Sequence, residues 1–126
     1  MKIIVNDEKF EGKFATVAVC NASFYGNGFM ISPNSSLTDG LIDVYVVNDI
    51  NKFEMFKLIL KMKKGHHEND SNIKKIVTNK INIITSNKIK CNIDGEVLED
   101  NKFELEIISN GITLYYNQKL IKEIIK

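Results

Sequence analysis

The sequence predicts a mainly β fold: an antiparallel β-sandwich with one α-helix inserted at about residues 51–64. Two observations support this prediction. From Ile73 onward, apolar and polar residues alternate with the period of two that is typical of strands with one buried face. Between residues 49 and 65, apolar residues instead recur at helical spacing. About eight strands and one long helix favour a sandwich to which the helix is attached.

The first two strands are expected at residues 2–6 and 11–20, joined at Asp7 and Glu8. The second strand is almost continuously apolar beyond Lys13, which indicates burial on both faces. Residues 21–47 then predict a glycine turn, a short strand, an irregular loop and a further strand. Gly26 and Gly28 permit the turn, and Pro33 opens the loop because it cannot donate to a sheet ladder.

Two acidic residues lie inside this otherwise uncharged stretch. Asp39 sits in the loop, where a carboxylate among exposed carbonyls could bind a hard cation such as Mg²⁺ or Ca²⁺. The spacing alone favours a simpler interpretation, in which Asp39 caps its own turn. Asp43 falls on the predicted strand 41–47 and shares a face with Leu41 and Tyr45, so it needs a partner that the sequence does not identify.

The predicted helix begins at a sequence that resembles a capping box, Asn51 followed by Glu54, and it ends at Gly65. Lysines crowd its second half. Favourable interaction with the helix dipole and solubility explain them most simply, and attraction to an anionic membrane surface is the alternative. The lysines are Lys57, Lys61, Lys63 and Lys64.

A polar connector at residues 66–72 follows the helix, and strands fill the remaining chain. We expect them around residues 76–84, 89–93, 103–107 and 112–116. Asn110-Gly111 is a strong hairpin signal, and Asp94-Gly95 reads most simply as another two-residue hairpin turn. Residues 118–126 have apolar residues at helical spacing and predict a short C-terminal helix that needs tertiary contact.

The composition excludes several classes of function. The chain has 126 residues, the length of one domain, and a net charge of +1. All 17 basic residues are lysine, so the arginine typical of phosphate and guanine recognition is missing, and we expect no nucleic-acid partner. His66 and His67 lack the further ligands of a zinc site. No signal peptide or membrane span is evident, so a cytoplasmic protein is expected, and a disulfide between Cys20 and Cys91 is possible but unsupported.

The order of these features resembles a known family. Asn21, Gly26-Asn27-Gly28, Pro33, Leu37-Thr38-Asp39-Gly40-Leu41-Ile42-Asp43-Val44, a helix and Asp94-Gly95-Glu96 follow one another as in the C-terminal domain of bacterial diacylglycerol kinase-type (YegS-like) lipid kinases. The resemblance extends from about residue 15 to residue 116. The Gly-Gly-Asp-Gly-Thr signature of the family's N-terminal nucleotide-binding domain does not occur here. We therefore expect residues 1–126 to be the second, lipid-side domain alone.

The resemblance implies specific roles. Asp94 corresponds to the carboxylate that takes the proton of the acceptor hydroxyl, and Glu96 supports the network of metal and water. Asp39, with the backbone carbonyls of Ser36 and Leu41, corresponds to a structural Mg²⁺ site. ATP with its Mg²⁺ would be bound mainly by the nucleotide-binding domain, so this chain alone should be inactive.

The implied substrate is diacylglycerol or a similar lipid alcohol. The implied partners are this lipid, the nucleotide-binding domain, a transient membrane surface at the inner face of the membrane, and, as an open possibility, a second copy in a homodimer. A non-enzymatic β-sandwich module that binds a lipid or a protein is the alternative. That alternative predicts no large exposed apolar face, whereas the kinase interpretation predicts one where the other domain docks.

Overall fold

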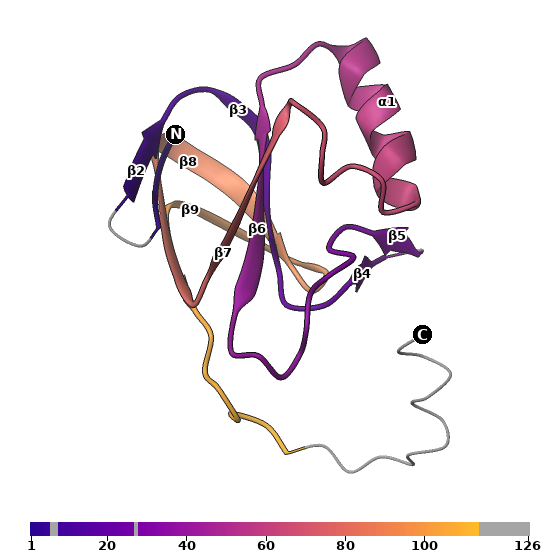
Figure 1. The fold of residues 1–126 in the computed structure, drawn as a ribbon. Helices are drawn as coiled ribbons and strands as arrows, with labels where there is room; N and C mark the ends of the chain where they lie inside the picture. The colour runs from indigo at the N-terminus through magenta and orange to yellow at the C-terminus, as the bar shows by residue number, and fades with distance from the viewer. Residues whose placement is uncertain (6–7, 27, 114–126) are drawn as a thin grey trace.

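The fold, obtained as a computed structural model, is described for residues 1–5, 8–26 and 28–113 (Figure 1). These residues form nine strands and one helix. A four-stranded antiparallel sheet has the order β2-β1-β8-β9, and a three-stranded antiparallel sheet has the order β3-β6-β7. A small hairpin pairs β4 with β5. The predicted antiparallel β fold with a single inserted helix is confirmed in this part of the chain, whereas the expected helix at residues 118–126 lies outside it.

The elements follow the chain in the order β1 Lys2–Val5, β2 Glu8–Glu11, β3 Phe14–Cys20, β4 Phe24–Tyr25, β5 Phe29–Met30, β6 Ile42–Asn48, α1 Lys52–Lys63, β7 Ile73–Thr78, β8 Lys80–Ile93 and β9 Glu96–Glu106.

Two of the sequence-based strand predictions were wrong. Residues 11–20 were expected to form one strand, but β2 and β3 are separate and belong to different sheets. Residues 76–84 were also expected to form one strand, but they fall in β7 and β8, which again belong to different sheets. The chain turns at Gly12, which exchanges two backbone hydrogen bonds with Met1. The turn at Asn110 is present, with φ at 57° and the Gly111 N–H donating to the Ile108 carbonyl. Residues 112 and 113 of the predicted strand 112–116 are not in a strand, and the rest of that prediction lies outside the described residues.

The hydrophobic core lies between the two larger sheets, as the sandwich prediction requires. Ile3, Val5, Ile81 and Ile83 come from one sheet, and alternate residues of β6 come from the other. The first six residues of β6 are all buried, so the strand is covered on both of its faces. Its even-numbered residues enter the sandwich core, while its odd-numbered residues point to the opposite face because side chains alternate along a strand.

Helix α1 covers this opposite side of the three-stranded sheet, together with the β4–β5 hairpin (Figure 1). The side chain of Asn51 accepts hydrogen bonds from the N–H groups of Phe53 and Glu54, both at 3.0 Å, so Asn51 caps the helix as predicted. Gly65 ends it with φ at 69°. A Cβ at Gly65 would lie 2.7 Å from the Met30 sulfur, which places the end of α1 against β5.

Strands β8 and β9 form a long, bent hairpin. Their pairing shifts between Ile84 and Ile89, and beyond this irregularity the hairpin runs behind the β6 sheet toward β4 (Figure 1). The Tyr25 hydroxyl donates to the Asn92 side chain at 2.9 Å, so the tip of the hairpin is attached to β4. This bend brings the turn at Asp94-Gly95 close to β4, which directly precedes Gly26 and Gly28 in the chain.

Candidate functional site

Lys75 on strand β7 is the partner that Asp43 was predicted to need. Asp43 is buried, and its Oδ1 atom lies 3.2 Å from the ammonium group of Lys75 on the neighbouring strand β7. Its Oδ2 atom accepts hydrogen bonds from the hydroxyls of Ser32, at 2.8 Å, and Ser35, at 2.5 Å. Every oxygen of this buried carboxylate is therefore matched by a donor, which removes most of the penalty for burying it.

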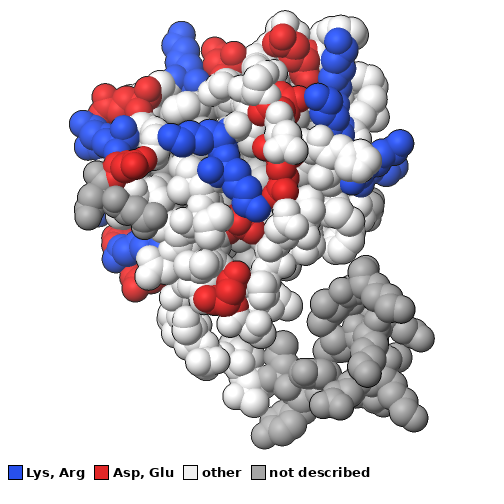
Figure 2. All heavy atoms as spheres, in the orientation of Figure 1, with Lys and Arg blue, Asp and Glu red and all other residues white. Residues whose placement is uncertain are grey.

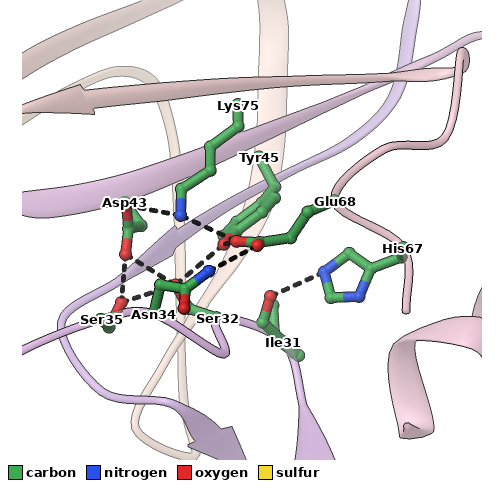
Figure 3. Close-up of polar contacts among 9 residues, drawn as sticks. All are labelled: Ile31, Ser32, Asn34, Ser35, Asp43, Tyr45, His67, Glu68 and Lys75. Carbon is green, nitrogen blue, oxygen red and sulfur yellow. Dashed lines mark hydrogen bonds and ion pairs between the residues drawn. The ribbon is translucent and has the colours of Figure 1, made fainter. Parts of the chain in front are cut away.

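The network continues from Asp43 to the connector that follows α1 (Figure 3). Lys75 also donates to Glu68 Oε1 at 2.7 Å, and the fully buried Tyr45 donates its hydroxyl to the same oxygen at 2.6 Å. Asn34 donates to the other Glu68 oxygen at 2.6 Å. These contacts join the β5–β6 loop, strands β6 and β7, and the connector. We call Ser32, Ser35, Asp43, Tyr45, Glu68 and Lys75 the buried polar network.

Charges within the buried polar network stabilise one another. Burial acts to raise the pKa of Asp43, but hydrogen bonds from Ser35, Ser32 and Lys75 outweigh it and hold that pKa below its usual value. The same balance lowers the pKa of Glu68, where burial is outweighed by hydrogen bonds from Lys75 and Tyr45. Burial and the bond to Glu68 raise the pKa of Tyr45 to about 12. At neutral pH the network therefore holds two carboxylates, one ammonium group and one neutral phenol.

His67 was predicted to lie in a polar connector, yet its side chain is fully buried. Its Nε2 atom pairs with the Ile31 carbonyl at 2.8 Å, and its ring lies 5.3 Å from the Tyr45 ring. Its Nδ1 atom has no hydrogen-bond partner among the described residues. The polar sequence around it gave no sign of this burial. The burial arises because the connector folds back over the side of β6 to which its odd-numbered residues point.

The predicted catalytic residues lie at the tip of the β8–β9 hairpin. Asp94 and Gly95 both have positive φ, 50° and 101°, which is the geometry of a two-residue type I′ turn. Asp94 is exposed, and Glu96 is the first residue of β9, paired with Ile93. The turn reverses the chain between Asp94 and Glu96, so the shared side-chain direction of an extended segment does not apply to them.

The turn at Asp94 is linked to β4 and is flanked by both polar and apolar side chains. The Asn92 side chain accepts both the Tyr25 hydroxyl and, at 3.2 Å, the Gly95 N–H. On the hairpin itself, large apolar side chains are exposed around the acid. They are Ile93 (47% exposed), Val97 (66%) and Leu98 (50%). The turn therefore presents an exposed carboxylate close to exposed apolar side chains on both faces of the hairpin, next to the polar residues Asn92 and Glu96.

The predicted metal-binding loop lies between β5 and β6. Asp39 Oδ1 accepts the Leu41 N–H at 2.9 Å, the bond expected of a residue that caps its own turn. The second oxygen, Oδ2, has no hydrogen bond among the described residues. None of the loop and turn hydrogen bonds in this part of the chain ends on the carbonyls of Ser36 or Leu41. These groups fit a hydrated hard cation, which needs few protein oxygens.

No cluster of three or more His, Cys, Asp or Glu side chains that could hold a metal occurs within the described ranges. The Asp39 loop, with its single carboxylate, differs from such a cluster. No hydrogen bond or ion pair within the described ranges joins the Asp39 loop to Asp94. The two predicted sites lie on different segments, one before β6 and the other at the tip of the β8–β9 hairpin.

The fold defines a class: antiparallel β-sandwich domains that carry one helix on the outside of the smaller sheet. Residues 1–116 match the model of the YegS C-terminal NAD kinase beta sandwich-like domain. The chain belongs to this family, and the resemblance predicted from its motifs is confirmed.

Individual relatives are named as lipid kinases. The "Diacylglycerol kinase" of Bacillus subtilis (strain 168) is 27% identical over 96 residues, which are 76% of this chain and 32% of that protein. A "Putative lipid kinase" of Staphylococcus carnosus (strain TM300) is 24% identical over 116 residues, 90% of this chain and 38% of that protein. The solved structure of "a putative diacylglycerol kinase" from Bacillus anthracis str. Sterne superposes with a TM-score of 0.78 at 25% identity, covering 94% of this chain and 41% of that one.

The chain thus spans 32% to 38% of the length of these two curated relatives. Within the described residues, α1 is too short and too polar to cross a membrane, and no other helix is present.

Proposed function

We propose that this chain is the lipid-side domain of an ATP-dependent kinase that phosphorylates the hydroxyl of diacylglycerol or a similar lipid alcohol. The observation that carries the proposal is the exposed Asp94 at a hairpin turn that lies close to exposed apolar side chains and is attached to β4 through Asn92. A lipid alcohol carries its hydroxyl group next to an apolar body, so it is complementary to a carboxylate that lies close to exposed apolar side chains.

Asp94 would accept a hydrogen bond from the acceptor hydroxyl and take its proton as the new oxygen–phosphorus bond forms. Phosphoryl transfer depends mostly on positioning and on neutralising charge, so a carboxylate that orients the hydroxyl suffices as the base. Glu96, next to the same turn, would support water around the reacting groups. ATP and its Mg²⁺ would be held mainly by a nucleotide-binding domain, and this chain alone would be inactive.

The Asp39 loop would hold a structural Mg²⁺ through the Asp39 carboxylate and the carbonyls of Ser36 and Leu41. Such an ion would fix the path of the loop where it enters β6. It would act on the loop and not in the chemical step, since Asp39 precedes β6 whereas Asp94 lies at the tip of the β8–β9 hairpin.

The exposed apolar surface supports this function over a self-contained binding module. Such a module was predicted to lack a large exposed apolar face. The described residues instead leave many large apolar side chains in solvent, as expected of a domain that meets another surface. They include Phe24, Leu37, Phe53, Phe56, Leu60, Val97, Leu98, Ile108 and Ile112.

The test replaces the matched segment of the Bacillus subtilis relative with this chain and measures transfer of labelled phosphate from ATP to diacylglycerol. We expect activity in the chimera and a loss of about a hundredfold or more in kcat with Asp94→Asn, the scale of a general base. Glu99→Gln, an exposed carboxylate on the same hairpin, is the matched control and should leave kcat unchanged. Normal turnover with Asp94→Asn would remove Asp94 from the role of base.

A further inference from the structure

Helix α1 has an apolar inner face and a second apolar face that points away from the protein. Leu58 is buried and Met55 and Met62 are half-buried, so these residues, spaced by three and four positions, form the inner face. Phe53 is 66% exposed, Phe56 58% and Leu60 52%, and the same spacing places them together on the opposite side. We call Phe53, Phe56 and Leu60 the outer face of α1.

A helix on a protein surface usually directs polar side chains toward water. Here the outward positions hold two phenylalanines and a leucine, each more than half exposed. Exposed apolar side chains that adjoin one another indicate a surface that another body covers, whereas isolated ones need no explanation. The inner residues already attach α1 to the domain, so the outer face contributes nothing to the described fold.

The charges beside the outer face indicate what covers it. Lys57, Lys63 and Lys64 are exposed and form no ion pair within the described residues. The Lys57 ammonium lies 4.3 Å from the centre of the Phe53 ring, so charge and apolar surface are directly adjacent. In Figure 2, basic side chains border uncharged surface at the upper right, where Figure 1 places α1.

We propose that the outer face of α1 binds an anionic lipid bilayer, with the helix lying in the plane of the interface. Phe53, Phe56 and Leu60 would enter the boundary between headgroups and acyl chains. The neighbouring lysines are long enough to keep their ammonium groups at the lipid phosphates. A row of large apolar side chains bordered by unpaired lysines is the composition of an interfacial helix, and its charge complements an anionic surface.

This inference concerns α1 alone and does not depend on the catalytic role proposed for Asp94. Lys61 is excluded from the binding surface because it is paired with Asp70 at 2.6 Å. The aromatic residues are expected to provide partition into the interface, while Lys63 and Lys64 provide the preference for anionic lipid and its sensitivity to salt.

The experiment is co-sedimentation of the 126-residue chain with vesicles of phosphatidylcholine alone or mixed equally with phosphatidylglycerol. We expect binding to the anionic vesicles, weakened by salt, and little binding to neutral ones. Lys63→Gln with Lys64→Gln should weaken binding roughly 25-fold, since each lysine near an anionic surface contributes about a factor of five. Phe53→Ala with Phe56→Ala should weaken it at constant charge.

Two matched controls separate the site from general stickiness. Lys88→Gln with Lys90→Gln removes two exposed charges on β8, and Ile108→Ala with Ile112→Ala removes two exposed apolar side chains beyond β9, far from α1 in Figure 1. Circular dichroism confirms that each variant is folded.

Three results would overturn the proposal. They are absence of wild-type binding to anionic vesicles, equal losses in the control variants, and a wild-type dimer that Phe53→Ala with Phe56→Ala dissociates while vesicle binding is unaffected. The last result would assign the outer face to a second copy of the chain.

Discussion

Replacing Lys75 with methionine tests whether the buried polar network stabilises the fold. Lys75 lies between two carboxylates, with its ammonium 2.7 Å from Glu68 Oε1 and 3.2 Å from Asp43 Oδ1. The three side chains are only 24%, 21% and 8% exposed, so water screens them weakly. Methionine keeps much of the apolar stem of lysine and removes its charge.

Removing one partner of a buried ion pair costs about 3–5 kcal/mol, because the other charge stays buried without compensation. Asp43 retains the Ser32 and Ser35 hydroxyls, and Glu68 retains other donors, so we expect about 3 kcal/mol, the lower end of this range. The free energy of unfolding of a typical domain is about 5–15 kcal/mol, so a loss of this size would be a large fraction of the total.

The assay is urea unfolding at neutral pH, followed by circular dichroism because the chain contains no tryptophan. Lys9→Met, which breaks the exposed pair between Lys9 and Glu11, is the matched control and should leave the midpoint almost unchanged. In the double variant Lys75→Met with Asp43→Asn, the two changes should together cost less than the sum of their separate costs. The reason is that Asp43→Asn removes a carboxylate that Lys75→Met would otherwise leave without its ammonium partner. A loss below about 1 kcal/mol for Lys75→Met would refute the reasoning, since exposed pairs contribute no more than that.

The remaining predictions concern pH, the helix and a loop glycine. Because the folded-state pKa values of Asp43 and Glu68 are lowered, wild-type stability should fall as pH drops below about 5, and Lys75→Met should reduce this dependence in unfolding titrations. Leu58→Ala should cost about 2–3 kcal/mol and lower helical ellipticity, since Leu58 is only 2% exposed. Gly40→Ala should cost about 1–2 kcal/mol because φ at Gly40 is 72°. The nearby Ser109 side chain is exposed and can move, so Ser109→Gly should not restore the stability of Gly40→Ala.

The features predicted correctly from sequence are those specified by neighbouring residues. The cap at Asn51 and the turn at Asp94-Gly95 each depend on a few consecutive side chains, and both are present. The family followed from the order of short motifs along the chain. In each case the information is local or is an order of local signals.

The features missed from sequence depend on strand register and on the path of a connector. Asp43 was known to need a partner, but choosing Lys75 requires knowing that β6 and β7 pair so that Tyr45 lies opposite Lys75. Neither the burial of His67 nor the role of Glu68 follows from a segment that reads as polar. An acid inside an apolar strand was the only signal, and it indicated a network without indicating its members.

The buried polar network also bears on the loop that carries Asp39. Ser32, Asn34 and Ser35 anchor the start of the β5–β6 loop to Asp43 and Glu68, and β6 fixes its end. The segment containing Asp39 is therefore held at both sides, so the loop needs no ion to be closed. An ion at Asp39 would act on the turn alone, so the domain should fold without it and become more stable when it binds.

Asp39→Asn distinguishes the two interpretations of this residue. Asparagine keeps a side-chain oxygen that can accept the Leu41 N–H, the bond that Asp39 makes at 2.9 Å, but it loses the charge that attracts a cation. Without Mg²⁺, the variant and the wild type should therefore unfold at nearly the same temperature. With Mg²⁺ at about a hundred times its dissociation constant, a bound ion would stabilise the wild type by about 2.7 kcal/mol, and the variant should not respond. Asp94→Asn, an exposed acid at the other predicted site, should keep the full response. If the unfolding temperature of the wild type does not change with Mg²⁺, Asp39 only caps its turn.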